Sequence, residues 1–239
     1  MANKAKATSR SDRRATIEAM RRQQQAQERR KTILFVSIAA ILGLVLIGLA
    51  AVPAILRSVN DPTKKAPASF GVPAAAAACD PTINEAPEGS GEHVPEGERV
   101  DYAAAPPASG RHDGDFILGA RSFYERGDRP AVEKLVHSLE HGYTVVWYDT
   151  DVAGDQIEAL RGLAQRMDTE PAARGKFIVA PWTSSEEGRQ ALPEGKNVAL
   201  THWGATQAFR QYCGSVSGEA VAAFVQAHPA SDAPEPNAA

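Results

Sequence analysis

The longest apolar stretch of the chain is the uncharged run ILFVSIAAILGLVLIGLAAVPAIL, residues 33–56. At 1.5 Å per residue, about 20 apolar residues cross the roughly 30 Å hydrocarbon core of a bilayer. The run therefore predicts a transmembrane helix. A cleaved signal peptide is the alternative, but its apolar core spans only about 7–15 residues. The length of the run favours an uncleaved signal anchor.

Beyond residue 90 the apolar positions recur with the periods of helices and strands. Val132, Leu135, Val136 and Leu139 are spaced as one face of a helix that Gly142 would end. Two more helices are predicted, one starting near Asp155 and one over residues 217–228 with Ser217 as its cap. Strands are predicted for the segments YTVVWYD, KFIVAPW and NVALTHWG. This order indicates an α/β or α+β fold, a single compact domain with a mixed sheet and packed helices.

These patterns divide the chain into five parts. Prolines recur between the apolar run and residue 90 without any hydrophobic period, which is typical of an extended linker. The final residues HPASDAPEPNAA are typical of a frayed tail. The expected parts are a basic segment 1–32, a transmembrane helix 33–56, a Pro/Ala-rich linker 57–89, a folded domain 90–228 and a disordered tail 229–239.

Charge predicts how the chain crosses the membrane. Residues 1–31 carry ten Lys or Arg and a net charge of +7, whereas the remainder carries 16 basic and 26 acidic side chains. Because basic residues stay on the cytoplasmic side, the N-terminus is expected in the cytoplasm and the domain outside the cell membrane. The acidic domain argues against a nucleic-acid partner.

Cys79 and Cys213 are the only cysteines of the chain. Both fall on the expected outer side, where disulfides persist. If joined, they would close a loop of more than 100 residues, which is worth about 4–5 kcal/mol in the chain-entropy model. Two unrelated thiols are the alternative.

The polar end of the first predicted helix carries the motif H-x-x-E-H, formed by His137, Glu140 and His141. The two histidines lie four residues apart and face away from the apolar stripe, a spacing that suits a metal clamp. A solvated helix face or charges placed at the negative end of the helix dipole would give the same pattern. The motif is also that of inverted zinc peptidases, with Glu219 as a distant third ligand. However, Gly142 and a strand follow where those enzymes continue as helix.

A loop upstream can complete a metal site. In PPASGRH, residues 106–112, prolines and glycine let the backbone fold over a helix face and bring His112 to the pair. Glu140 or Asp113 would then serve as a fourth ligand or as a partner of a ligand; His93 lies in the same Pro- and Gly-rich region. We assign no catalytic residue, because the chain has no nucleophile elbow, phosphate loop, dinucleotide fingerprint or C-x-x-C pair.

Two of these motifs resemble the domain of unknown function 3105 family, which occurs in actinobacterial membrane-anchored proteins. The resemblance rests on PP-x-SG-x-H (residues 106–112) and LVHSLEHG (residues 135–142), with a later THWG, and covers about residues 90–215. The chain departs from the pattern at Arg111, where proline is expected, and at His202, where alanine is expected. The resemblance implies that His112, His137, Glu140 and His141 belong to the family pattern, and we expect these four residues to form the metal site. It implies no activity.

Three functions remain open at this point. The first is a membrane-anchored extracytoplasmic domain that binds copper or zinc, the metals that imidazole suits. The second is a non-catalytic structural or interaction domain of the cell envelope, whose His/Glu motif is a hydrogen-bond network and whose partner is another envelope protein. A metal-dependent hydrolase is the third, and enzymatic activity is the less favoured class.

Overall fold

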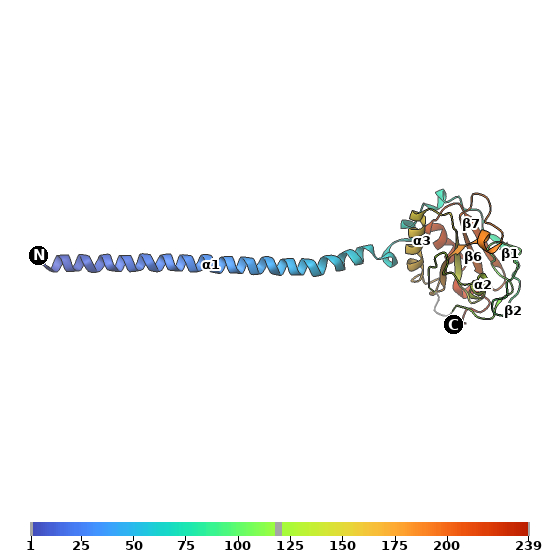
Figure 1. Cartoon of the computed structure of the whole chain (residues 1–239), viewed down its shortest axis with the longest axis horizontal. Helices are drawn as coiled ribbons and strands as arrows, with labels where there is room; N and C mark the ends of the chain where they lie inside the picture. The colour runs from blue at the N-terminus through green and yellow to red at the C-terminus, as the bar shows by residue number, and fades with distance from the viewer. Residues whose placement is uncertain (1, 118–120, 239) are drawn as a thin grey trace. The chain divides into compact units, whose positions relative to one another are not determined.

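A computed structural model describes residues 2–117 and 121–238 (Figure 1) and divides the chain into a helical unit that ends at Asn60 and a folded domain that begins at Asp61. The helical unit is α1, Ala2–Asn60, which contains the whole predicted apolar run. In the described part of the chain it is the one helix long and apolar enough to cross a membrane. It is therefore a candidate membrane anchor or signal sequence. The helix starts well before residue 33 because the basic segment is rich in Ala, Gln and Arg, which are good helix formers.

The folded domain has an α+β architecture around a five-stranded mixed sheet with the order β1-β7-β6-β4-β5. β4 and β5 are parallel, and the other neighbouring strands are antiparallel. The strands of this sheet are β1 (Ile83–Glu85), β4 (Thr144–Asp149), β5 (Phe177–Trp182), β6 (Val198–Trp203) and β7 (Ala208–Cys213). A separate parallel pair is formed by β2 (His93–Val94) and β3 (His112–Asp113).

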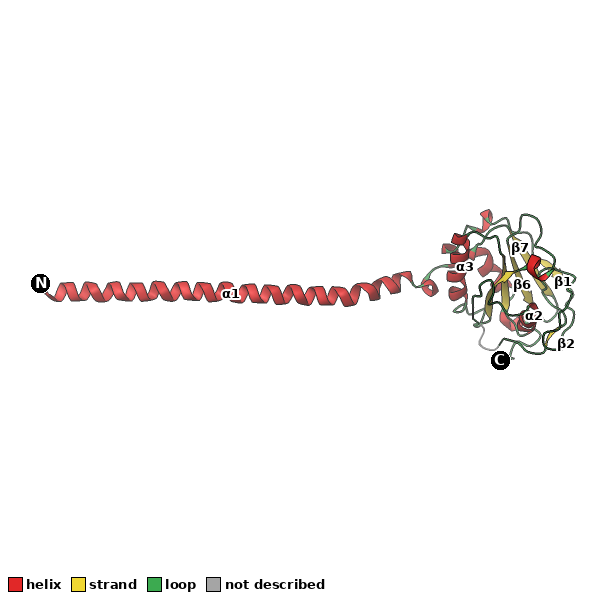
Figure 2. Cartoon of the chain, viewed as in Figure 1, coloured by secondary structure: helices red, strands yellow, loops and turns green. Residues whose placement is uncertain are grey.

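Helices cover both faces of the sheet, so the strands lie between them (Figure 2). On one face, α3 (Gly154–Met167) and α5 (Gly218–Ala227) pack against side chains such as Val146 and Leu200. On the other face, α2 (Val132–Glu140) packs against their strand neighbours, including Val145 and Trp147. Successive residues of a strand point to opposite faces, so each central strand contributes to both cores. The short α4 (Ser184–Glu187) follows β5.

The predicted helix boundaries agree with the structure. Ser217 caps α5, its hydroxyl accepting a hydrogen bond from the Ala220 backbone N–H. Gly142 follows the end of α2 with a φ of +96°, and a Cβ at this position would lie 2.5 Å from the Ala230 carbonyl oxygen. Both the left-handed conformation and the close approach require glycine here.

The structure differs from the expectation of an extended linker over residues 57–89. Residues 61–85, here called the N-terminal strap, pack onto the domain through three 3-10 turns and β1; the turns are Pro62–Lys64, Pro67–Ser69 and Ala74–Ala76. Phe70 of the strap is buried in the α3/α5 core, with its ring against the position of Gly162. Prolines exclude a periodic helix from this segment, but they do not prevent individual side chains from packing or β1 from pairing with the sheet edge.

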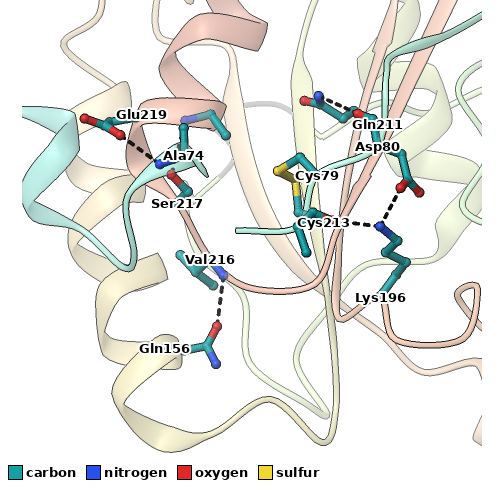
Figure 3. The surroundings of a disulfide bond; sticks show 12 residues. Ala74, Cys79, Asp80, Gln156, Lys196, Gln211, Cys213, Val216, Ser217 and Glu219 are labelled. Atoms are coloured by element: carbon teal, nitrogen blue, oxygen red, sulfur yellow. Dashed lines mark hydrogen bonds and ion pairs between the residues drawn. A yellow bond between two sulfur atoms is a disulfide. The ribbon is translucent and has the colours of Figure 1, made fainter. Parts of the chain in front are cut away.

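A disulfide between Cys79 and Cys213 joins the strap to β7 (Figure 3). Polar contacts support it on both sides: Lys196 contacts Asp80 at 2.6 Å, and Glu219 accepts a hydrogen bond from the Ala74 backbone N–H at 2.8 Å. Glu219 thus holds the strap. This structural role differs from the role of third metal ligand that Glu219 would have in the peptidase motif. A disulfide agrees with an extracytoplasmic location.

The C-terminal segment also differs from its expectation, a disordered tail over residues 229–239. It forms a 3-10 turn, Ala230–Asp232, with Ala230 and Ala233 buried. Lys176 donates hydrogen bonds from its ammonium group to three backbone carbonyls, those of His141, Pro236 and Ala238. The segment therefore docks beside the C-terminal end of α2, held by contacts to its backbone that composition does not reveal.

Candidate metal centre

Three short elements bring together four side chains that can bind a metal. β2 and β3 pair so that His93 lies opposite His112, and α2 supplies His137 and Glu140 from its last turns. One ligand atom from each of these four residues lies within 4.8 Å of the others. We call these four residues the His/Glu cluster.

The loop before β3 has a conformation that only glycine adopts readily. Gly110 has a φ of +140°, and a Cβ there would come within 2.8 Å of the Tyr102 ring. The Tyr102 hydroxyl donates a hydrogen bond to the Arg111 carbonyl and so fixes the loop one residue before His112. The His112 ring then packs edge-on to the buried Trp203 of β6, with ring centroids 5.8 Å apart. The PP-x-SG-x-H motif, through His112, and the THWG motif, through Trp203, are thus in direct contact.

The tautomer of the His112 ring follows from its neighbours. Its Nδ1 lies 2.8 Å from the Gly110 carbonyl oxygen, and because a carbonyl only accepts, Nδ1 carries the hydrogen. In the neutral ring Nε2 then carries a lone pair and no hydrogen. This atom lies 3.0 Å from Oε2 of Glu140 without a hydrogen bond of good geometry. Both side chains are essentially inaccessible to solvent, at 0% and 1%. Two facing lone pairs in a buried site require a cation between them, either a proton or a metal ion.

His137 has the same arrangement. Its Nδ1 lies 2.8 Å from the Asp113 carbonyl oxygen, which leaves Nε2 as the nitrogen with an available lone pair. Burial, reinforced by the neighbouring imidazoles of His112 and His141, lowers the pKa of His137 to about 4. The ring is therefore neutral at pH 7, the form that binds metals. Metal-binding histidines commonly donate their other N–H to a carbonyl or carboxylate, as both of these rings do.

Glu140 is a buried carboxylate with one oxygen already engaged. Oε1 accepts hydrogen bonds of 2.8 Å from the Ser90 hydroxyl and from the Gly91 backbone N–H. Burial alone would raise the pKa of Glu140, but the contact with His112 and the hydrogen bonds from Ser90 and Gly91 lower it to about 2. The group is charged at neutral pH, and Oε2 is the oxygen that points to the histidines.

His93 completes the cluster from its solvent side. Its ring centroid lies 5.0 Å from that of His112 and 4.9 Å from that of His137. Unlike the other three residues it is exposed. The cluster is thus closed on three sides and open at His93.

His141, which the sequence places in the site, lies beside the cluster rather than in this group of four. Its ring contacts His137 and Phe116, with centroids 4.6 Å and 4.4 Å apart. Its Nε2 lies 3.4 Å from the carboxylate of Glu235 in the docked C-terminal segment. The i, i+4 spacing of His137 and His141 is therefore compatible with contact between the rings but does not aim both at one point.

The sequence predicted that three of the four cluster residues share a site, namely His112, His137 and Glu140. It also offered Asp113 as a partner, and Asp113 takes part through its backbone carbonyl, while its carboxylate accepts backbone N–H groups of Gly97 and Asp115. His93 was not included. The pairing of β2 with β3 brings His93 to the site. A strand of two residues has no periodicity from which this pairing could be predicted.

Three imidazole nitrogens and one carboxylate oxygen form a set that suits zinc or copper. Donors about 2.0–2.1 Å from one ion lie roughly 3–4 Å apart. The 3.0 Å separation of the His112 and Glu140 atoms falls in that range, and the largest separation of 4.8 Å needs only a modest contraction. The orphaned Nε2 of His112, fully buried and directed at a carboxylate, is the feature that such an ion would satisfy.

The same geometry separates the cluster from the inverted zinc peptidases. In those enzymes both histidines of H-x-x-E-H hold the metal and the glutamate is the general base. Here the glutamate is a member of the donor group, and the second histidine, His141, faces Glu235. α2 also ends at Glu140 instead of continuing.

Comparison with known proteins assigns a family but no activity. The family described as "Protein of unknown function (DUF3105)" matches residues 93–239, which includes the whole His/Glu cluster. No curated protein and no solved structure matches the chain significantly.

Proposed function

The chain belongs to the DUF3105 family, and we propose that it is a membrane-anchored extracytoplasmic protein whose domain binds copper or zinc. The observation that carries the proposal is the contact between Nε2 of His112 and Oε2 of Glu140, a lone pair and a carboxylate 3.0 Å apart in a buried site. A divalent ion held by His93, His112, His137 and Glu140 would satisfy both atoms. We assign no catalytic activity to it.

The location is supported by three observations. α1 carries a long uncharged run, basic residues gather before this run, and the domain contains a disulfide. A single span with the N-terminus in the cytoplasm accounts for all three. The membrane is then the one partner that the chain itself implies.

A structural role is the second candidate, and the hydrogen bonds of Glu140 favour it. This carboxylate ties the Ser90–Gly91 loop and β3 to α2, so a protonated His112 paired with Glu140 would serve as a docking network for the two loops. Such a domain would present its surface to another envelope protein. The two candidates differ in one respect, whether the cation between His112 and Glu140 is a proton or a metal.

Calorimetric titration of the full-length protein in detergent with Cu²⁺ and with Zn²⁺ tests the metal. We expect binding in the micromolar range or tighter for both ions, with Cu²⁺ the tighter of the two, as the usual order of divalent affinities requires. His112→Gln together with His137→Gln should weaken binding by more than about 100-fold, beyond the effect of losing an outer-shell partner.

His141→Gln is the matched control, because it removes a buried imidazole from the C-cap of the same helix but not from the cluster. It should change the affinity by less than about tenfold. If the wild-type protein binds neither ion more tightly than about 1 mM, the metal function is wrong and the docking network is the remaining role.

A further inference from the structure

The four residues of the His/Glu cluster differ sharply in their access to solvent. His112, Glu140 and His137 are 0%, 1% and 4% exposed, whereas His93 is exposed. An ion in the cluster would therefore be shielded by protein on the side of the three buried ligands. Among the four ligands of the cluster, His93 is the one that solvent reaches.

The buried ligands are also fixed in position. Hydrogen bonds to the Gly110 and Asp113 carbonyls orient the rings of His112 and His137, and two donors hold one oxygen of Glu140. Moving any of these three away from an ion would break buried hydrogen bonds, each of which is costly to leave unmade.

His93 is held much less firmly. It lies on a two-residue strand whose neighbour in the sheet is β3, outside the five-stranded sheet. Its imidazole is exposed and contacts the cluster through the rings of His112 and His137. Local openings concentrate where few buried contacts hold a segment.

From these differences, and resting on the proposed metal function, we infer that His93 is the exchange ligand of the site. A small soluble chelator removes the metal, and its complex with the metal delivers it. In both directions a nitrogen or oxygen donor of the chelator takes the position of the His93 imidazole. In this step the bond from the metal to His93 breaks, a bond to the incoming donor forms, and the metal keeps its oxidation state. His112, His137 and Glu140 stay bound during this first step of removal, and the ion leaves when further donors of the chelator replace them; delivery follows the same steps in reverse.

Stopped-flow transfer of Zn²⁺ from the full-length protein to a chromophoric chelator tests the inference. In the wild type, the rate should level off at high chelator concentration, because departure of His93 becomes limiting. His93→Ala should still bind Zn²⁺, with an affinity reduced about 10- to 100-fold, and should transfer it at least about tenfold faster, at a rate linear in chelator. Glu92→Gln, which changes an exposed neighbour, should behave as the wild type.

Two results would overturn the inference while leaving the metal site intact. In the first, His93→Ala transfers metal at the wild-type rate, so that His93 controls no exchange. In the second, it loses metal as completely as His137→Ala, so that all four ligands are equivalent. Failure of the wild type to bind either Zn²⁺ or Cu²⁺ would instead reject the proposed function itself. Since His93 is exposed, an unchanged thermal unfolding curve of the metal-free variant shows that the fold is retained.

Discussion

Replacing Cys79 and Cys213 together by alanine is expected to lower the free energy of unfolding by about 5 kcal/mol, because their disulfide closes a loop of 134 residues in the unfolded chain. The disulfide also joins the N-terminal strap to β7 of the five-stranded sheet. An effect of this size is a large part of the stability of an ordinary domain. Urea denaturation of the full-length protein, followed by tryptophan fluorescence, measures it.

The single substitution Cys79→Ala is the control for this prediction. It breaks the same bond and should lose nearly as much stability as the double variant, since the remaining Cys213 is buried in an apolar core that suits a free thiol. Wild-type protein treated with a reductant should behave likewise. A loss below about 1 kcal/mol would mean that Phe70 and β1 hold the strap without the disulfide.

Substitution of Glu140 by glutamine is expected to have the second large effect. The carboxylate is buried, and its pKa is lowered from 4.5 to about 2 in the folded protein, which corresponds to about 3 kcal/mol of stability at pH 7. Because the folded pKa is the lower one, this contribution is complete above pH 4.5 and is lost as the pH falls from 4.5 to 2. The stability difference between wild type and variant should therefore be largest near neutral pH and vanish towards pH 2.

The same variant should also lose the stabilisation that added metal gives the wild type. A ligand that binds only the folded state raises the unfolding free energy, by about 2.7 kcal/mol at 100 times its Kd. Glu133→Gln is the matched control: Glu133 is a buried carboxylate of the same helix, but it pairs with Arg189 outside the cluster. This control should lose stability and keep the metal response. Equal metal responses in wild type and Glu140→Gln would contradict the assigned ligand.

The elements with strong periodicity were predictable from the sequence. The apolar run in α1, the stripe Val132–Leu139 of α2 and the apolar strands β4, β5 and β6 all appear where their patterns place them. β7 was missed because its sequence AFRQYC contains Arg210 and Gln211. Arg210 is nevertheless buried, since it pairs with Glu85 and donates to the Pro106 carbonyl, and such partners lie more than 100 residues away.

The candidate site was predictable in part, for a related reason. Helical spacing places His137 and Glu140 on the polar side of α2, and the glycine- and proline-rich loop makes the approach of His112 plausible. In the structure loops cover this polar side, and His137 and Glu140 are buried. The sequence does not show this cover, and a solvated helix face was therefore an open alternative. The choice of His93 over His141 depends on a tertiary pairing and on the docked C-terminal segment, neither of which has a local pattern.

Electron paramagnetic resonance of the full-length protein with one equivalent of Cu²⁺ tests the metal centre most directly, because the spectrum reports the atoms bound to the ion. We predict an axial signal with hyperfine splitting from coordinated imidazole nitrogens, as expected for copper in a site of nitrogen and oxygen ligands. The spectrum should lose this wild-type nitrogen pattern in His112→Gln and keep it in His141→Gln. A spectrum of hydrated copper, or one identical in wild type and His112→Gln, would contradict a metal centre in the His/Glu cluster.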